Sequence, residues 1–131
     1  MDTVTITALG ARGEGLAEVD GARVFVPFTL PGDVAGIEHE GDRGVLVSLV
    51  EPGPDRIDPF CPYFGSCGGC GLQHVGPATY SAFKRGLVVD ALVHGGIDVA
   101  VDELIDARGN GRRRATLHAD NTKAGYMRAR M

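Results

Sequence analysis

The stretch Leu16-Ala-Glu-Val-Asp-Gly-Ala-Arg-Val-Phe-Val26 decides the fold of the first half of the chain. Residues suited to extended structure stand on both sides of the dipeptide Asp20-Gly21. Asp-Gly between two such runs is typical of a tight turn that joins neighbouring antiparallel strands. The stretch therefore predicts a β-hairpin.

Further extended runs surround this hairpin. Residues 3–8 alternate polar and apolar side chains, residues 34–40 resume an extended pattern after two prolines, and residues 44–50 are almost continuously apolar. Five short strands in about fifty residues favour a small closed barrel over an open sheet, because an open sheet would expose its edges. We therefore expect a mainly β chain with some α structure, beginning with an OB-like five-stranded barrel.

The pattern changes at Glu51-Pro-Gly-Pro-Asp55, because two prolines around a glycine cannot continue a strand ladder. After a cysteine-rich loop, Pro77 is suited to the first turn of a helix and Gly95-Gly96 to its end. One face of this helix carries an apolar stripe, for which we expect packing against a core. The stripe consists of Tyr80, Phe83, Leu87 and Ala91. Weaker strand signals after the helix, over residues 99–105 and 113–119, predict the start of a mixed α/β central domain.

The length of 131 residues fits one medium domain or two small ones. We expect four parts: a barrel over residues 1–52, a linker over 53–60, a cysteine-rich segment over 61–76, and a helix with an incomplete central domain over 77–131. No apolar run approaches the ~20 residues that span a bilayer, and the N-terminus lacks a signal-peptide pattern. We therefore expect no membrane association and a location in the reducing cytoplasm.

The net charge of −4 conceals an asymmetry along the chain. Residues 1–60 carry four arginines against eleven acidic residues, whereas residues 61–131 carry nine basic residues against six acidic ones. The last 24 residues hold seven basic residues and only one acidic residue, Asp120. Such a chain can present a basic surface to an anionic partner although its total charge is negative.

All three cysteines of the chain, Cys61, Cys67 and Cys70, lie within ten residues. Their soft thiolates favour an iron-sulfur cluster or zinc over a hard cation. Both kinds of centre normally take four ligands, so one is missing, and His74, His118 or a cysteine beyond this chain would supply it. A redox pair is less favoured, because Gly-Gly between Cys67 and Cys70 is a poor helix start and Cys61 is left over.

At this point two stretches carry a family resemblance. Residues 13–33, Gly-Glu-Gly-Leu-Ala-Glu-Val-Asp-Gly-Ala-Arg-Val-Phe-Val-Pro-Phe-Thr-Leu-Pro-Gly-Asp, resemble a TRAM domain, a small RNA-binding β-barrel. The cysteine-rich segment up to Gln73-His74, followed by Tyr80 and Lys84, is similar to the iron-sulfur region of TRAM-bearing, S-adenosylmethionine-dependent uracil-5 RNA methyltransferases. Residues 112–118 and Gly125-Tyr126 more loosely resemble the start of that family's central RNA-binding domain. The resemblance covers nearly all of this chain but only the front of the family's proteins.

The resemblance implies that Cys61, Cys67 and Cys70 bind a [4Fe-4S] cluster whose fourth cysteine lies downstream, and that His74 forms a hydrogen bond beside the cluster. It also implies a further domain that binds S-adenosylmethionine and carries the cysteine that attacks uracil C6. Residues 1–131 contain neither the fourth cluster cysteine nor the cofactor-binding domain with its catalytic cysteine. No cysteine follows Cys70, and no glycine-rich cofactor fingerprint is present. We expect a monomer that binds ribosomal or transfer RNA and transfers no methyl group by itself.

Candidate RNA contacts lie on the barrel and in the basic tail. Small barrels bind single-stranded RNA through cationic side chains on phosphates and aromatic rings on bases. The barrel candidates are Arg12, Arg23, Phe25, Phe28 and Arg43. In the tail, Arg112 and Arg114 would share one face of a strand, with Arg113 on the other, among many positive charges.

A second class of function fits the same residues. A stand-alone RNA-binding or adaptor protein, with the cysteines holding a structural zinc, needs no missing domain. Colour distinguishes the two classes, since an iron-sulfur protein is brown and a zinc protein is colourless.

Overall fold

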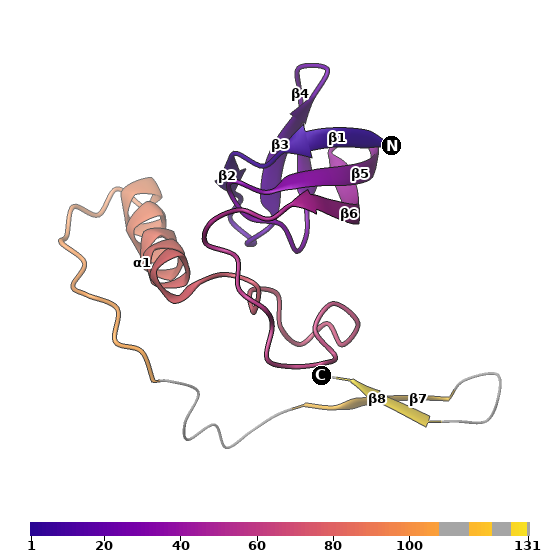
Figure 1. Cartoon of the computed structure of the whole chain (residues 1–131). Coiled ribbons are helices and arrows are strands. Elements are labelled where there is room, and N and C mark those ends of the chain that lie inside the picture. The colour runs from indigo at the N-terminus through magenta and orange to yellow at the C-terminus, as the bar shows by residue number, and fades with distance from the viewer. Residues whose placement is uncertain (108–115, 122–126, 131) are drawn as a thin grey trace.

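The computed structural model describes residues 1–107, 116–121 and 127–130. In this part of the chain, six strands form one sheet, a single helix follows it in sequence, and two further strands form a separate small sheet (Figure 1). The strands of the large sheet are β1 (Asp2–Thr5), β2 (Ala8–Leu9), β3 (Gly15–Val19), β4 (Ala22–Val26), β5 (Val34–Glu40) and β6 (Arg43–Glu51). The helix is α1 (Pro77–His94), and the small sheet contains β7 (His118–Asn121) and β8 (Met127–Arg130). The expected fold class, mainly β with an OB-like barrel and a helix, is confirmed.

The first segment of the chain closes the large sheet into a barrel. The strand order is β1-β5-β6-β4-β3-β2, so β1 and β2 lie at its two ends. β1 pairs antiparallel with β5, and β2 pairs antiparallel with β3. Because β1 and β2 are consecutive pieces of one segment, that segment borders both ends of the sheet.

The change of partner explains why six strands appear where the sequence predicts five. At Ile6 the backbone leaves β5: its N–H donates to the Asp33 carbonyl, and its carbonyl accepts from the Gly32 N–H, both at 2.9 Å. The next N–H, of Thr7, donates to the Leu16 carbonyl at 2.9 Å. The predicted strand over residues 3–8 is therefore divided into β1 and β2.

The hairpin predicted around Asp20-Gly21 is confirmed. β3 and β4 pair antiparallel, with Val19 opposite Ala22. Asp20 and Gly21 have φ angles of 50° and 81°, the left-handed conformation that a two-residue turn of this kind requires at both positions. The alternation of side chains along β4 then directs Val24 and Val26 into the barrel, where both are fully buried.

The core lies inside the barrel and is built from small and branched apolar side chains. Its members are Val4, Ile6, Ala17, Val24, Val26, Ala35 and Ile37, with Val19 and Leu46 packed against them. Burial of this surface is the main favourable term for the fold. All members of this cluster come from the chain up to β6. Val75, beyond β6, is also buried but is not a member of the cluster.

The helix begins at Pro77 and is followed by Gly95, as the sequence predicts. The prediction that its apolar stripe packs in a core is wrong for the described residues, since no residue of α1 is buried. Tyr80 remains 38% exposed. The physical reason is that α1 stands beside the barrel and no other described helix or strand covers it (Figure 1).

The strand predicted over residues 113–119 lies partly outside the described residues, and the described strand β7 pairs with β8. Residues 99–105, the other segment expected as a strand, form none. The expected division of the chain into four parts stays a prediction. In the described part of the chain, no helix is both long enough and apolar enough to cross a membrane.

Candidate functional site

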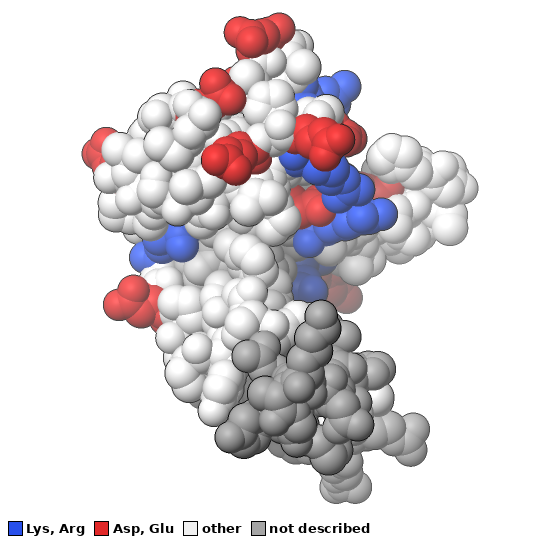
Figure 2. Space-filling model, turned by 90° about the vertical axis from the view of Figure 1, so that its right-hand side faces the viewer, with Lys and Arg blue, Asp and Glu red and all other residues white. Residues whose placement is uncertain are grey.

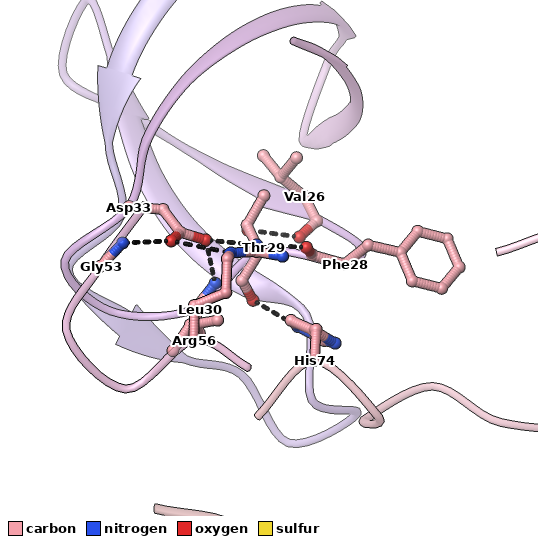
Figure 3. Close-up of polar contacts among 8 residues, drawn as sticks. All are labelled: Val26, Phe28, Thr29, Leu30, Asp33, Gly53, Arg56 and His74. Carbon is pink, nitrogen blue, oxygen red and sulfur yellow. Dashed lines mark hydrogen bonds and ion pairs between the residues drawn. The ribbon is translucent and has the colours of Figure 1, made fainter. Parts of the chain in front are cut away.

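A buried carboxylate, Asp33, joins the end of the barrel to the chain that leaves it (Figure 3). One oxygen of Asp33, Oδ1, accepts from the Gly53 N–H at 2.7 Å and from Arg56 Nε at 3.1 Å. The other, Oδ2, accepts from the Leu30 N–H at 2.9 Å and from Arg56 Nη2 at 2.6 Å. Paired contacts of this kind between a guanidinium and a carboxylate are strong and fix the geometry.

Asp33 remains ionised in this environment. Burial alone raises the pKa of a carboxyl group. Here the hydrogen bonds from Arg56, Gly53 and Leu30 outweigh burial and hold the pKa of Asp33 below its ordinary value of 3.8. Sequence reasoning missed Asp33 and Arg56, because a single acid and a single base 23 positions apart give no local signal.

Arg56 also fixes the backbone of Phe28. Its Nη2 donates to the Phe28 carbonyl at 2.8 Å. Phe28 has a φ of 65°, which is unusual and strained for a residue with a bulky side chain. The hydrogen bond helps to hold this conformation, and the ring of Phe28 is directed away from Asp33 (Figure 3).

His74 inserts into the same end of the barrel and is fully buried. Its Nε2 makes a long hydrogen bond, 3.4 Å, to the carbonyl of Thr29. Since a carbonyl only accepts, Nε2 carries the proton, and Nδ1 has no hydrogen-bond partner in the described part of the chain. Burial lowers the pKa of His74 below 6.5, and the contact with Thr29 offsets this only in part, so the ring is held neutral. The hydrogen bond that His74 forms is thus with the barrel, and the role expected for it beside a cluster stays a prediction.

The two ends of the cysteine-rich segment lie side by side at the end of the barrel, and we call this pair of ends its base. The Ile57 N–H donates to the His74 carbonyl at 3.0 Å, and the Gly76 N–H donates to the Asp55 carbonyl at 2.8 Å. Both ends of the segment are therefore tied to each other at the barrel. Between them the chain forms a series of turns (Figure 1).

The three cysteines lie along these turns and form no disulfide. Cys61 and Cys67 are half-buried and Cys70 is exposed. The Cys61 N–H donates to Gln73 Oε1 at 3.2 Å, and the Cys67 N–H donates to the Tyr63 carbonyl at 2.9 Å. Among the described residues, no three His, Cys, Asp or Glu side chains are grouped closely enough to hold a metal ion. The assignment of Cys61, Cys67 and Cys70 as ligands stays a prediction.

Three rings connect the segment to the barrel. Phe64, which lies between Cys61 and Cys67 in sequence, meets Phe28 edge-on, with ring centroids 5.3 Å apart and planes at 83°. Its centroid lies 5.6 Å from that of His74. We call Phe28, Phe64 and His74 the ring cluster. Phe28, expected as an RNA contact, is thus occupied by another part of the chain.

Two of the predicted RNA contacts lie near the same turn. Arg12 is exposed in the turn between β2 and β3. Gly13, beside it, has a φ of 81°, and a Cβ there would lie 2.7 Å from Leu72 Cδ2, so the turn packs closely on the cysteine-rich segment. Arg43 lies 62% exposed at the start of β6 and pairs with Glu14 of this turn, Nη1 to Oε1, at 3.3 Å.

The other candidates lie elsewhere. Arg23 stands opposite Glu18 on the β3–β4 hairpin, and Phe25 is half-buried. Arg112 and Arg114 lie outside the described residues. On the face drawn in Figure 2, Lys and Arg side chains gather on the right, beside acidic side chains, with a smaller group on the left. On this face, an anionic partner would therefore meet basic side chains over a restricted area.

The apolar stripe of α1 borders a groove of about 440 Å³ between the helix and the barrel. Its walls are Leu9, Gly10 and Ala11 on the barrel and Phe83, Gly86, Leu87, Asp90, Ala91 and His94 on the helix. Three of the four stripe residues thus face this groove, while the helix remains without a buried residue.

The amino-acid sequence of the chain was compared with those of known proteins. No protein-family model matches the chain. Proteins named uncharacterized RNA methyltransferase from Rhizobium meliloti and Agrobacterium fabrum are 46% and 44% identical to it over 127 and 131 residues, covering 92% and 95% of this chain. The chain is homologous to RNA methyltransferases.

A more distant relative carries a more specific name. The protein named 23S rRNA (uracil(1939)-C(5))-methyltransferase from Francisella tularensis subsp. novicida is 35% identical over 105 residues, which are 76% of this chain. The chain spans 31%, 32% and 23% of the length of the Rhizobium, Agrobacterium and Francisella methyltransferases. The barrel, the cysteine-rich segment and α1 therefore correspond to a part of these RNA methyltransferases.

Proposed function

We propose that this chain is the RNA-recognition and [4Fe-4S]-binding portion of an RNA uracil-5 methyltransferase that uses S-adenosylmethionine. The observation that carries the proposal is the similarity of nearly the whole chain to RNA methyltransferases, one of them named for methylation of uracil C5 in 23S rRNA. The barrel supports it, because small OB-like barrels commonly bind single-stranded RNA. A cytoplasmic location is part of the proposal, because a reducing compartment keeps the three thiolates available to bind a cluster.

The donor set of the cysteine-rich segment fits the proposed cluster. Cys61, Cys67 and Cys70 offer three soft thiolates on one segment whose base is fixed to the barrel. A [4Fe-4S] cluster takes four thiolates, so the fourth ligand comes from outside the three cysteines of this chain. Bound there, the cluster would cross-link the turns of the segment and stabilise them.

The three cysteines are assigned to the cluster and not to catalysis. Methylation at uracil C5 needs a free thiolate that adds to C6 and a base that removes the C5 proton. A thiolate that binds iron is not free to add to C6 of the uracil ring. Purified chain 1–131, incubated with S-adenosylmethionine carrying a labelled methyl group and a uridine-containing RNA, should therefore transfer no label, and transfer would contradict this assignment.

The cluster and the RNA contacts are tested separately. Anaerobic reconstitution with iron and sulfide should give brown protein with broad visible absorption, whereas colourless protein with stoichiometric zinc would support the zinc adaptor instead. For RNA, fluorescence anisotropy with a labelled single-stranded uridine-containing RNA should show binding that weakens with salt.

Variants assign the RNA contacts. Replacing Arg12 or Arg43 by Ala should reduce the salt slope by about 1 each, because each removes one phosphate contact. Arg85→Ala removes the same charge from α1, where the guanidinium donates to the carbonyls of Val101 and Asp102, and serves as the control. The double replacement of Arg112 and Arg114 by Ala tests the tail in the same assay. Slopes equal to that of the unmodified chain would reject these contacts.

A further inference from the structure

The position of Phe64 ties the middle of the cysteine-rich segment to the barrel. Phe64 is three residues after Cys61 and three before Cys67. Its ring contacts Phe28 and His74, at centroid distances of 5.3 and 5.6 Å. Contacts between aromatic rings at such distances are favourable beyond the burial of their surface.

Both partners of Phe64 are themselves fixed. His74 is fully buried and directs Nε2 to the Thr29 carbonyl. Phe28 has its carbonyl held by Arg56, whose guanidinium also pairs with the buried Asp33. The ring of Phe64 therefore packs against a surface that cannot easily move.

The other aromatic side chains of the segment behave differently. Phe60, next to Cys61, is 88% exposed, and Tyr63 is 67% exposed. Phe64 is only partly exposed and is a member of the ring cluster. Of these three aromatic residues within five positions, Phe64 is the one whose ring holds the chain against the barrel.

We propose that Phe64 is a positioning residue: through the ring cluster, the barrel sets the separation of Cys61 and Cys67 and so prepares the segment to bind metal. This inference rests on the proposed metal binding by these cysteines. A loop tied only at its base must give up the freedom of its whole length when the thiolates converge on a metal. A loop also held at Phe64 has fewer conformations to lose, so it binds the metal more tightly.

The test uses the full chain 1–131, free of metal and reduced, titrated with cobalt(II). Thiolate bonds to cobalt give an intense charge-transfer absorption that a change in barrel stability alone does not produce. Phe64→Ala should weaken cobalt binding about tenfold, the upper end of what an aromatic pair contributes. Phe64→Tyr keeps the ring and should restore binding, and Phe60→Ala, one residue before Cys61, should bind cobalt as the unmodified chain does.

Amide hydrogen exchange in the metal-free chain gives a second and independent measurement. The N–H groups of Phe64, Ser66 and Cys67 are hydrogen-bonded within the segment. In Phe64→Ala these amides should exchange about tenfold faster, while amides of β4 and β5 keep their rates. Phe60→Ala should change neither group.

The outcomes separate the two proposals. If the unmodified chain binds neither cobalt nor iron, the proposed metal site fails, and exchange alone decides whether Phe64 orders the segment. If the unmodified chain binds cobalt and Phe64→Ala binds it equally well, the positioning role is wrong while the metal site stands. Unchanged exchange of Phe64, Ser66 and Cys67 in the Phe64→Ala chain would also overturn the positioning role.

Discussion

Removal of the Asp33 carboxylate is expected to be among the most damaging single changes to this chain. Asp33 is fully buried and accepts hydrogen bonds from the Leu30 and Gly53 N–H groups and from two nitrogens of Arg56. In Asp33→Ala, both backbone donors lose their acceptor. Arg56, whose side chain is only 16% exposed, becomes a positive charge without its partner.

The size of the loss follows from these contacts. Breaking a buried ion pair by removing one partner costs about 3–5 kcal/mol, because the remaining charge stays buried. The two unpaired N–H groups add to this loss, since each buried donor without an acceptor costs about 1–3 kcal/mol unless water reaches it. We therefore expect Asp33→Ala to lower the free energy of unfolding by about 4 kcal/mol or more, a large fraction of the 5–15 kcal/mol typical of a domain.

Urea denaturation followed by circular dichroism measures this difference. Asp55→Ala is the matched control, since Asp55 lies on the same connection but is exposed. Within the described part of the chain, its side chain accepts a single hydrogen bond, from Thr79 Oγ1. That variant should lose less than about 1 kcal/mol. The double variant Asp33→Ala with Arg56→Ala should lose less free energy of unfolding than the two single variants lose together, because no buried charge is then left without its partner. A loss at Asp33 equal to that at Asp55 would refute the argument.

Three further predictions concern the same region and the barrel turns. Lowering the pH below 6.5 should destabilise the chain, because the unfolded state then takes up a proton at His74 that the folded state resists. The free energy of unfolding, measured by urea titration, should fall by at most about 1.4 kcal/mol per pH unit. This dependence on pH should diminish in His74→Phe. Arg56→Lys should cost about 2 kcal/mol by the same assay, because one ammonium cannot replace the fork that contacts Asp33 and the Phe28 carbonyl. Gly15→Ala should cost about 3 kcal/mol, since its Cβ would collide with Thr29 Oγ1 and lie 2.8 Å from Ile6 Cγ2. Gly21→Ala, in open space but at a φ of 81°, should cost only about 1 kcal/mol, and equal losses at the two glycines would contradict the packing argument.

Local patterns predicted the elements well. Asp20-Gly21 gave the hairpin, and Pro77 and Gly95 gave the limits of α1, because each of these signals acts over a few residues. The bend at Ile6–Thr7 was not predicted, since it depends on which strand lies beside each residue and not on the residue types. The stripe on α1 was assigned to a core for the same reason: periodicity identifies an apolar face but not whether another element covers it.

The site shows the same limit. The three cysteines and His74 were proposed as candidates because they lie close together in sequence, and their role as a metal site stays a prediction. Asp33, Arg56 and the ring of Phe28 were not recognised as one unit, because their contacts span 23 to 36 positions of the chain. Such long-range contacts depend on the fold of the whole barrel and not on a local pattern.

The closure of the barrel by its first segment also sets an order of events during synthesis. β1 pairs with β5 and β2 pairs with β3, so the first nine residues have no complete set of partners until β5 has left the ribosome. Arg56, which secures Asp33, emerges later still. Until then the growing chain exposes two strand edges, which are sites for pairing with other chains. A chain shortened from its N-terminus by these nine residues would keep both edges exposed permanently, so its defect would be aggregation of a folded sheet as much as loss of stability.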